Sequence, residues 1–310
     1  MRFLVVGAGA IGGYFGGRLL EAGREVTFLV RPARAAQLAA TGLVIRSRYG
    51  DATLPSPPRV LADELSQPFD VVLLSCKAYD LDQAMASFAP AVGAGTAILP
   101  LLNGLNHLDT LAERFGAEPV LGGQCFISAS LDPTGAVLHL NENHALSFGE
   151  RDGTMSGRVR AIAAAMAGAR FDVRASDQIL LEMWEKWVFI ASLAGITCLM
   201  RATVGDIVAA GGADLALGLL AECAAVAEAA GCAPRSESIE RIRGLLSAAG
   251  SPLAASMLRD VERGAPTEAA HILGDLLRRR GPASGPDRSL LRLAFAHLSA
   301  YEARRVREAV

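Results

Sequence analysis

The stretch that decides the fold lies near the start of the chain and reads Phe3-Leu4-Val5-Val6-Gly7-Ala8-Gly9-Ala10-Ile11-Gly12. Four bulky apolar residues in a row are typical of a buried strand, and the segment after them has the apolar spacing of a helix. Between strand and helix, the pattern GxGxxG permits a tight turn, a close approach of a ligand to the backbone, and close packing of the helix on the strand. The N-terminus of such a helix offers N–H donors to a phosphate. The stretch therefore predicts a dinucleotide-binding turn, with contacts from Gly7, Ala8, Gly9, Ala10, Ile11 and Gly12.

The end of the next apolar strand, expected at residues 26–30, indicates which dinucleotide is bound. Sites for NAD carry an Asp or Glu about 20 residues further on, where it holds the ribose 2′-hydroxyl. This chain has Arg31 there, with Arg34 one helical turn later. Because guanidinium groups bind phosphate bidentately, we expect NADP(H) as the cofactor and Arg31 as the main contact to its 2′-phosphate. The alternative is that both arginines are solvated loop residues.

The first half of the chain alternates short apolar strands with helical segments. Strands are expected at residues 3–6, 26–30, 71–74 and 97–102, a small hairpin at 43–47 and the residues after Asp51, and short strands at 119–121, 136–140 and 146–148. Continuous apolar strands separated by helices form parallel sheets that are covered on both faces. This half therefore predicts a Rossmann-type domain.

From about Asp177 the pattern changes to long helical periodicity. Helices are expected at residues 177–198, 213–230, 236–248, 251–263, 267–280 and 288–308, punctuated by Gly231, Gly250, Gly264 and Gly281. The predicted fold class is therefore α/β, with an NADP-binding Rossmann-like domain at residues 1–175 and an all-helical domain for substrate and catalysis at residues 176–310.

The composition excludes several classes of protein. The 310 residues are 51% hydrophobic with a formal net charge of −2, so we expect neither a disordered chain nor a nucleic-acid partner. No apolar run reaches the roughly 18 residues of a membrane-spanning helix, and the N-terminus lacks the layout of a signal peptide. Five cysteines without CxxC spacing favour the reducing cytoplasm over a disulfide framework, and the five histidines show no metal-binding spacing, so no metal is expected.

Lysine is almost absent: of the 30 basic residues, only Lys77 and Lys186 are lysines. A position that keeps lysine in an arginine-rich chain favours a role for a compact ammonium whose pKa can be shifted. Lys77 follows the strand at 71–74, and Asn103 follows the strand at 97–102. Both are therefore expected at the carboxyl ends of parallel strands, where ligands bind. The alternatives are an exposed loop charge and a turn residue before Gly104.

Together these residues resemble the ketopantoate reductase (2-dehydropantoate 2-reductase) family over essentially the whole chain. The motifs that carry the resemblance are the glycine turn, Lys77-Ala78, Asn103-Gly104, Trp184-Glu185-Lys186, Ser256-Met257-Leu258-Arg259-Asp260 and Thr267-Glu268. Members have a Rossmann domain and a helical domain with the active site in the cleft between them. They reduce a 2-oxo acid to a 2-hydroxy acid with NADPH on the route to pantothenate. The resemblance implies the same cofactor, reaction and small-molecule substrate class here.

The resemblance also implies roles for individual residues. Lys186 is similar to the general acid that protonates the carbonyl oxygen, and Glu268 to the carboxylate that contacts the cofactor ribose and orients that lysine. Ser256 is similar to a substrate-binding hydroxyl. Further contacts are implied at Asn103 (to nicotinamide and substrate), Lys77 (to cofactor) and Ala129 (to cofactor, through its backbone). The chemistry is coherent, since ketone reduction needs a proton donor and a positive field at the oxygen. The alternative for Ser256 and Glu268 is ordinary capping and surface charge.

The chain departs from the family pattern at the expected substrate pocket. Where the family has asparagines four and eight residues after the lysine and three before the serine, this chain has Ile190, Ala194 and Leu253. We expect Ile190 and Ala194 to line a pocket that is less polar than usual. One hypothesis is therefore a ketopantoate reductase-like enzyme for a different, less polar 2-oxo acid. The sequence also leaves open oxidation of a 2-hydroxy acid, a non-catalytic NADP(H)-binding regulator, and whether the chain forms a homodimer.

Overall fold

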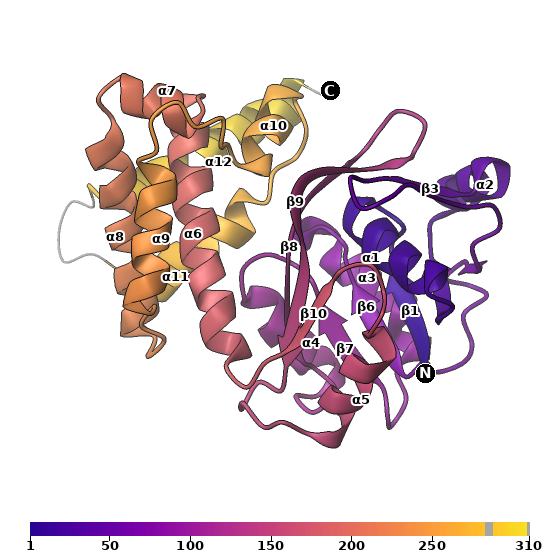
Figure 1. Cartoon of the computed structure of the whole chain (residues 1–310). Helices are drawn as coiled ribbons and strands as arrows, with labels where there is room; N and C mark the ends of the chain where they lie inside the picture. Colours follow the sequence, from indigo (N-terminus) through magenta and orange to yellow (C-terminus); the bar gives the residue numbers. More distant parts are fainter. Residues whose placement is uncertain (283–287, 309–310) are drawn as a thin grey trace. The chain divides into compact units, whose positions relative to one another are not determined.

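The computed structural model describes residues 1–282 and 288–308, which fold as two compact units (Figure 1). The N-terminal unit comprises Met1–Asn103 and His107–Leu180, and the helical unit comprises Gly104–Asn106 and Leu181–Val310. The N-terminal unit is α/β, whereas the helical unit contains helices and no strand within the described residues. The predicted fold class is thus confirmed.

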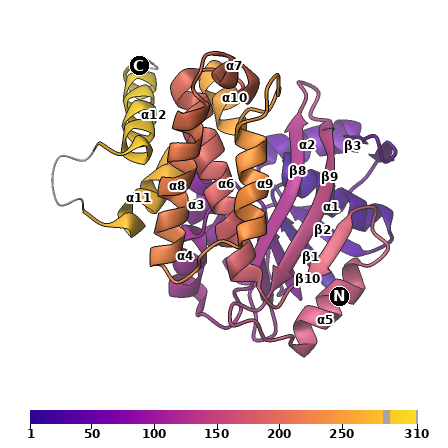
Figure 2. The same cartoon turned by 60° about the vertical axis from the view of Figure 1, so that its left-hand side comes forward.

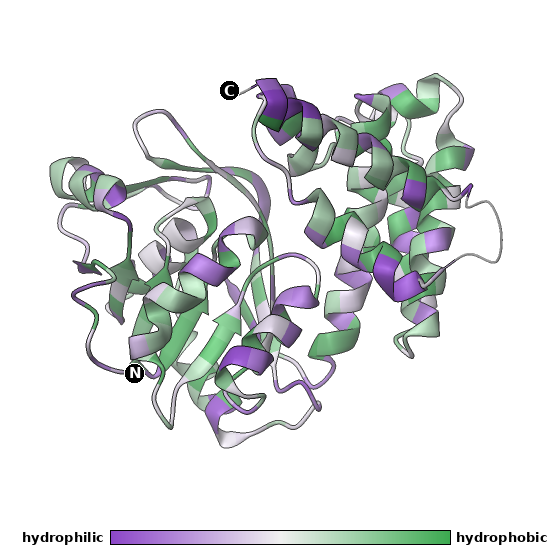
Figure 3. Cartoon of the chain, turned by 180° about the vertical axis from the view of Figure 1, so that it is seen from behind, coloured by the Kyte–Doolittle hydropathy of each residue, from purple (hydrophilic) through white to green (hydrophobic). Residues whose placement is uncertain are grey.

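The first sheet of the N-terminal unit is parallel, in the order β5-β2-β1-β6-β7. Its strands are β1 (Arg2–Val6), β2 (Glu25–Leu29), β5 (Arg59–Val60), β6 (Val71–Leu74) and β7 (Ala97–Pro100). Val6 is in register with both Leu29 and Leu74, so β1, β2 and β6 end at the same edge of the sheet. β6 and β7 are buried at every position, which explains their unbroken apolar sequences. Figure 3 shows these central strands as the most hydrophobic part of the unit.

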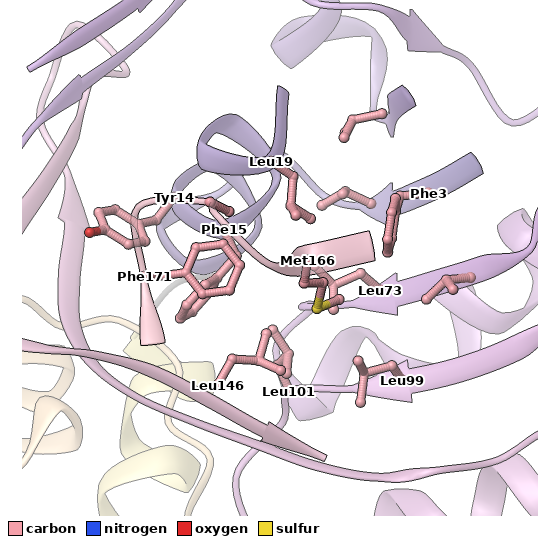
Figure 4. Packing of buried hydrophobic residues seen from close by; sticks show 14 of the residues in the cluster. Phe3, Tyr14, Phe15, Leu19, Leu73, Leu99, Leu101, Leu146, Met166 and Phe171 are labelled. Carbon is pink, nitrogen blue, oxygen red and sulfur yellow. The ribbon is translucent and has the colours of Figure 1, made fainter. Parts of the chain in front are cut away.

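Helices follow the strands of this unit and connect them. They are α1 (Ala10–Glu21), α2 (Pro32–Thr41), α3 (Leu81–Phe88), α4 (Asn106–Phe115) and α5 (Gly157–Met166), with short 3₁₀ turns η1 (Ala78–Asp80) and η2 (Ala89–Ala91). Helix α1 contacts strands of both sheets, and the buried core gathers around it (Figure 4). Phe15 on this helix packs edge-on against Phe171, with ring centroids 4.9 Å apart.

A second, mixed sheet was not predicted. It has the order β10-β9-β3-β4, with β8 paired antiparallel to β9. Its strands are β3 (Leu43–Arg46), β4 (Ala52–Leu54), β8 (Gly122–Leu131), β9 (Val137–Gly149) and β10 (Asp172–Ala175). The expected strands at 136–140 and 146–148 belong to one continuous strand, β9. The sequence predicts two strands because the residues between them, Asn141-Glu142-Asn143, are polar. The expected strand at 119–121 is only a single bridge between Ile98 and Val120.

The helical unit is built around one long helix, α6 (Ile179–Met200), which runs alongside α8 and α9 (Figures 1 and 2). The other elements are α7 (Val204–Ala209), α8 (Ala213–Ala229), α9 (Ser236–Leu246), α10 (Ser256–Glu262), the π-helical η3 (Ala270–Gly274), α11 (Asp275–Arg280) and α12 (Leu290–Glu308). Among the residues described, none of these helices is apolar over a length that could cross a membrane.

The helix that was expected from residue 251 begins five residues later. The Ser251 and Leu253 carbonyls accept hydrogen bonds from the Gly205 and Val204 amides, both 2.9 Å long. The backbone of this segment therefore satisfies the N-terminal amides of α7 instead of continuing a helix of its own.

Candidate active site

The glycine turn after β1 has the geometry that a dinucleotide requires. Gly7 has φ +89°, a region that favours glycine, and its amide donates to the Leu29 carbonyl at 2.9 Å. A Cβ on Gly12 would overlap the Gly7 carbonyl oxygen and the Ser75 hydroxyl, so α1 can pack on β1 only with glycine there. A Cβ on Gly9, in contrast, would meet no atom within 4 Å. The backbone at Gly9 is therefore open to an approaching ligand.

The N-terminus of α1 is suited to an anion. Gly9 is the N-cap residue and provides no side-chain hydrogen bond, and the first turn holds no acidic residue. The backbone amides and the positive end of the helix dipole therefore remain available for a phosphate group. These residues fit the pyrophosphate of a dinucleotide.

Arg31 lies at the carboxyl end of β2, as predicted, but it already has partners. Its Nη2 donates to Asp80 Oδ1 and to Gln83 Oε1, both at 2.8 Å. Asp80 ends the turn η1 that follows β6, and Gln83 lies in the first turn of α3. The ion pair therefore connects the ends of the two strands that flank β1.

Arg34, one helical turn after Arg31, is bound to two backbone carbonyls. Its Nε donates to the Ala8 carbonyl at 2.9 Å, and its Nη1 donates to the Gly135 carbonyl at 3.0 Å. Burial lowers the pKa of this guanidinium. Arg34 thus ties the glycine turn to the tip of the β8–β9 hairpin, because its place on α2 brings two backbone carbonyls within reach.

The remaining predicted residues of the N-terminal unit lie at strand ends or at an irregularity. Lys77 is partly buried and follows β6 as the N-cap of η1, and Asn103 follows β7. Ala129 lies immediately after a shift in the β8–β9 register, where the Ser128 amide donates to Asn141 Oδ1 at 2.9 Å. Such irregularities often redirect the backbone beside functional sites.

Lys186 lies on α6 and is partly exposed between two buried neighbours. Glu185 is 5% exposed and accepts hydrogen bonds from the Arg235 backbone amide at 2.9 Å and from its Nε at 2.8 Å. Burial raises the pKa of this carboxyl, but the bonds from Arg235 outweigh burial and hold the pKa below its usual value. On the other side, the fully buried Trp187 donates from Nε1 to the Ile272 carbonyl at 2.9 Å.

Glu268 immediately precedes the helical segment and does not lie inside it, although the sequence predicts a helix at residues 267–280. Helical structure begins at the next residue and continues as the π-helical η3. The Glu268 carbonyl accepts from both the His271 and the Ile272 amides, at 3.0 and 2.8 Å. π-helical segments are rare and are found frequently at functional sites.

Two contacts fix the backbone on either side of Glu268. The Thr267 amide and hydroxyl both donate to Glu302 Oε1 on α12, at 2.6 and 2.7 Å. Burial raises the pKa of the Glu302 carboxyl, but the bonds from Thr267 and Arg305 hold it below its usual value. On the other side, the Ile272 carbonyl is the one bound by Trp187. The segment with Glu268 is therefore fastened to the helix of Lys186.

The expected substrate residues fall on two helices of the same unit. Ile190 and Ala194 follow Lys186 by one and two turns on α6; the first is partly exposed and the second is 4% exposed. Ser256 is exposed and is the first residue of α10, which keeps it on the same helix face as Asp260. Leu253 lies before α10 and is partly exposed.

Sequence reasoning missed the residues that hold these groups in place. Asp80 and Gln83 lie about 50 positions after Arg31, Ile272 lies 85 positions after Trp187, and Glu302 lies 35 positions after Thr267. No local pattern indicates such pairs. Among the described residues, no group of three or more His, Cys, Asp or Glu side chains could hold a metal ion.

Comparison with known proteins agrees with this geometry. The sequence matches the family model for ketopantoate reductase PanE/ApbA over residues 3–153 and the model for its C-terminal region over residues 178–302. It is 40% identical over 306 residues to the uncharacterized oxidoreductase YkpB of Bacillus subtilis, covering 98% of this chain and 99% of that protein. It is 30% identical over 290 residues to a 2-dehydropantoate 2-reductase of Mesorhizobium japonicum, covering 86% and 88%.

Solved structures show the same relationship. The crystal structure of the 2-dehydropantoate 2-reductase from Geobacter metallireducens matches with a TM-score of 0.86 and 31% identity, over 97% of this chain and 99% of that one. The resemblance noted from the sequence is thus confirmed. The chain therefore belongs to the ketopantoate reductase family and is an NADP-dependent oxidoreductase of small 2-oxo acids, acting on CH–OH groups.

Proposed function

We propose that the chain reduces 2-dehydropantoate to pantoate, with Lys186 as the general acid and Glu268 as its partner. The observation that carries the residue assignment is the 2.9 Å hydrogen bond from Trp187 to the Ile272 carbonyl. Trp187 is the neighbour of Lys186, and Ile272 follows Glu268 by four residues. The bond therefore holds the two candidate catalytic segments together within one unit.

The residues that would hold the cofactor lie mainly in the N-terminal unit. The amides at Ala8, Gly9, Ala10, Ile11 and Gly12 suit the pyrophosphate, and Arg31 suits the 2′-phosphate. Gly7, whose amide is bound to the Leu29 carbonyl, contributes the turn that brings these amides to the ligand. Lys77, Asn103, Ala129 and Glu268 are further proposed contacts. When bound, NADPH supplies the hydride.

Lys186 acts at the oxygen of the substrate carbonyl. When hydride adds to the carbonyl carbon, the π electron pair moves onto oxygen, which becomes basic. The Lys186 ammonium stabilises this charge and transfers a proton to the oxygen, giving the hydroxyl of the 2-hydroxy acid. The neutral amine then takes a proton from solvent. Oxidation in the reverse direction would use the neutral amine as the base.

Glu268 and Ser256 serve positioning and binding in this proposal. A carboxylate near the lysine favours its protonated form and can orient it through a hydrogen bond. The Ser256 hydroxyl can donate to or accept from a polar group of the substrate. The amide of Asn103 can do the same on the cofactor side.

A second candidate substrate is a less polar 2-oxo acid. It is favoured by the apolar side chains Ile190, Ala194 and Leu253. A substrate hydroxyl left without a partner there would lose about 1–3 kcal/mol of binding. A substrate without that hydroxyl, such as 2-oxoisovalerate, would lose nothing.

The test is NADPH oxidation with a panel of 2-oxo acids, using wild type, Lys186→Ala and Lys186→Arg. Arginine keeps the positive charge but cannot give up its proton at ordinary pH. We expect both variants to bind NADPH as wild type does and to lose about 100-fold or more in kcat. Full turnover by Lys186→Arg would contradict a general acid at this position.

The panel itself distinguishes the substrates. The highest kcat/KM with 2-dehydropantoate supports a place in pantothenate biosynthesis. The five cysteines without CxxC spacing support a cytoplasmic location. A higher value with 2-oxoisovalerate supports the second candidate. Tight NADPH binding without turnover of any member of the panel would favour a non-catalytic regulator.

A further inference from the structure

The ion pair between Arg31 and Asp80 bears on how strongly the site prefers one dinucleotide. Arg31 is the proposed contact to the 2′-phosphate, and its side chain is 64% exposed, whereas that of Asp80 is 33% exposed. The two side chains come from the ends of β2 and β6, on either side of the strand that leads into the glycine turn. A carboxylate therefore lies 2.8 Å from the guanidinium that is proposed to receive an anion.

The atom through which Arg31 binds Asp80 is one that a bidentate phosphate contact would also need. A guanidinium can bind an oxyanion bidentately along two edges, Nε with Nη2 or Nη1 with Nη2. Both edges include Nη2. In this structure Nη2 donates to both Asp80 and Gln83. A bidentate grip on a phosphate therefore requires Arg31 to release at least one of these two partners.

The Asp80 side chain does not cap the helix at whose start it lies. Asp80 is the N-cap residue of α3, yet its side chain makes no capping hydrogen bond. Its backbone amide instead donates to the Lys77 carbonyl at 2.9 Å, a bond that any residue but proline could make. The carboxylate can thus be neutralised without removing a cap.

We propose that Asp80 is a specificity-determining residue that reduces the preference for NADPH over NADH. Its carboxylate competes with the 2′-phosphate for Arg31 and repels the phosphate charge. Toward NADH it has no such effect, because NADH carries a neutral 2′-hydroxyl in place of the phosphate, and a carboxylate can accept a hydrogen bond from a hydroxyl. This inference rests on the proposed role of Arg31 in the cofactor site.

The experiment measures the dissociation constants of NADPH and NADH for the full chain without substrate, by nicotinamide fluorescence. The variants are Asp80→Asn, Arg31→Ala and the double variant. Asp82→Asn is the matched control, because it removes the same charge two residues further on, from an exposed position in the first turn of α3. Release of an exposed ion pair and of one repulsive charge should tighten NADPH binding by Asp80→Asn roughly three- to tenfold. NADH binding should stay within about twofold or weaken, and Asp82→Asn should change neither constant by more than about twofold.

Other outcomes overturn specific parts. Weaker NADPH binding by Asp80→Asn, or equal tightening of both dinucleotides, would exclude Asp80 as a determinant of the preference. A full gain from Asp80→Asn in the Arg31→Ala background would exclude competition for Arg31 as its cause. If Arg31→Ala leaves the preference for NADPH over NADH unchanged, the proposed 2′-phosphate contact itself fails. If Arg31→Ala lowers that preference but Asp80→Asn leaves it unchanged, only the present inference fails.

Discussion

Gly9→Ala should separate cofactor binding from folding. Gly9 has φ −78° and ψ −161°, which alanine adopts without strain, and its Cβ would meet no atom within 4 Å. Alanine restricts the unfolded chain, which stabilises by about 0.4–1 kcal/mol, and is a poorer N-cap than glycine by a similar amount. The two effects oppose each other. The midpoint of thermal unfolding should therefore stay within about 3 °C of wild type.

NADPH binding should respond very differently. The space that is empty beside Gly9 is where the pyrophosphate is expected to reach the backbone amides. A methyl group there would hold a phosphate oxygen beyond hydrogen-bond distance, with loss of at least one charge-assisted bond of about 1.5–3 kcal/mol. The dissociation constant of NADPH should rise roughly 10- to 150-fold. The upward shift of the melting temperature that a saturating ligand gives should shrink accordingly.

Gly12→Ala is the control with the opposite pattern. Its Cβ would overlap the Gly7 carbonyl and the Ser75 hydroxyl, so α1 must move away from β1. Such overpacking costs about 1–3 kcal/mol, and the unbound protein should melt earlier. The assay is thermal unfolding with and without NADPH, together with a fluorescence titration. If Gly9→Ala bound NADPH as tightly as wild type, the phosphate would not approach this turn, and the assignment of the site would be refuted.

Two further predictions concern the helical unit. Trp187→Phe removes the donor to the buried Ile272 carbonyl. We expect a loss of about 1–3 kcal/mol in the free energy of unfolding and a fall in kcat, with unchanged NADPH affinity. An unchanged kcat would show that this bond does not position Glu268. Because the pKa of Glu185 is lowered in the folded state, its pairing with Arg235 stabilises fully above the ordinary carboxyl value of 4.5 and is lost as the pH falls through the lower folded value. Glu185→Gln should therefore be destabilising in urea titrations near neutral pH and much less so in acid, and an equal difference at both would rule out the ionised pair as the cause.

The parts of the fold that could be predicted are those whose sequence carries a local signal. The strands β1, β2, β6 and β7 are apolar without interruption because both faces are buried, and the glycines after β1 fix the turn by their stereochemistry. The β8–β9 hairpin carries this signal only at the two ends of β9, where strands were expected. β8 is made largely of small and polar residues, and β9 is polar in its middle, so β8 and the centre of β9 lack the alternation that indicates a strand. Their pairing with each other supplies the stability that their sequences do not show.

The candidate site divides in the same way. Lys186, Arg31 and Asn103 could be named because they stand at the ends of expected strands or within a recognisable motif. The backbone conformation at Glu268 could not be predicted, because it depends on the hydrogen bonds from Thr267 to Glu302 and from Trp187 to Ile272. These pairs join elements that are far apart in sequence, and a hydrogen bond between distant segments leaves no periodicity in either.

Arg31 and Arg34 show most clearly why residue type alone does not assign a role. In the sequence they are equivalent guanidiniums one helical turn apart, and both suit a phosphate. In the structure Arg34 donates to the Ala8 and Gly135 carbonyls as well as to the Gln37 side chain, and so supports the glycine turn, whereas Arg31 donates to a carboxylate and an amide side chain. Side-chain partners can rotate away when a ligand binds, whereas backbone carbonyls stay fixed in the fold, so a ligand that takes Arg34 from them leaves two acceptors without that donor. Cofactor preference therefore depends less on how many arginines follow β2 than on whether the partners of each one can be exchanged for a phosphate.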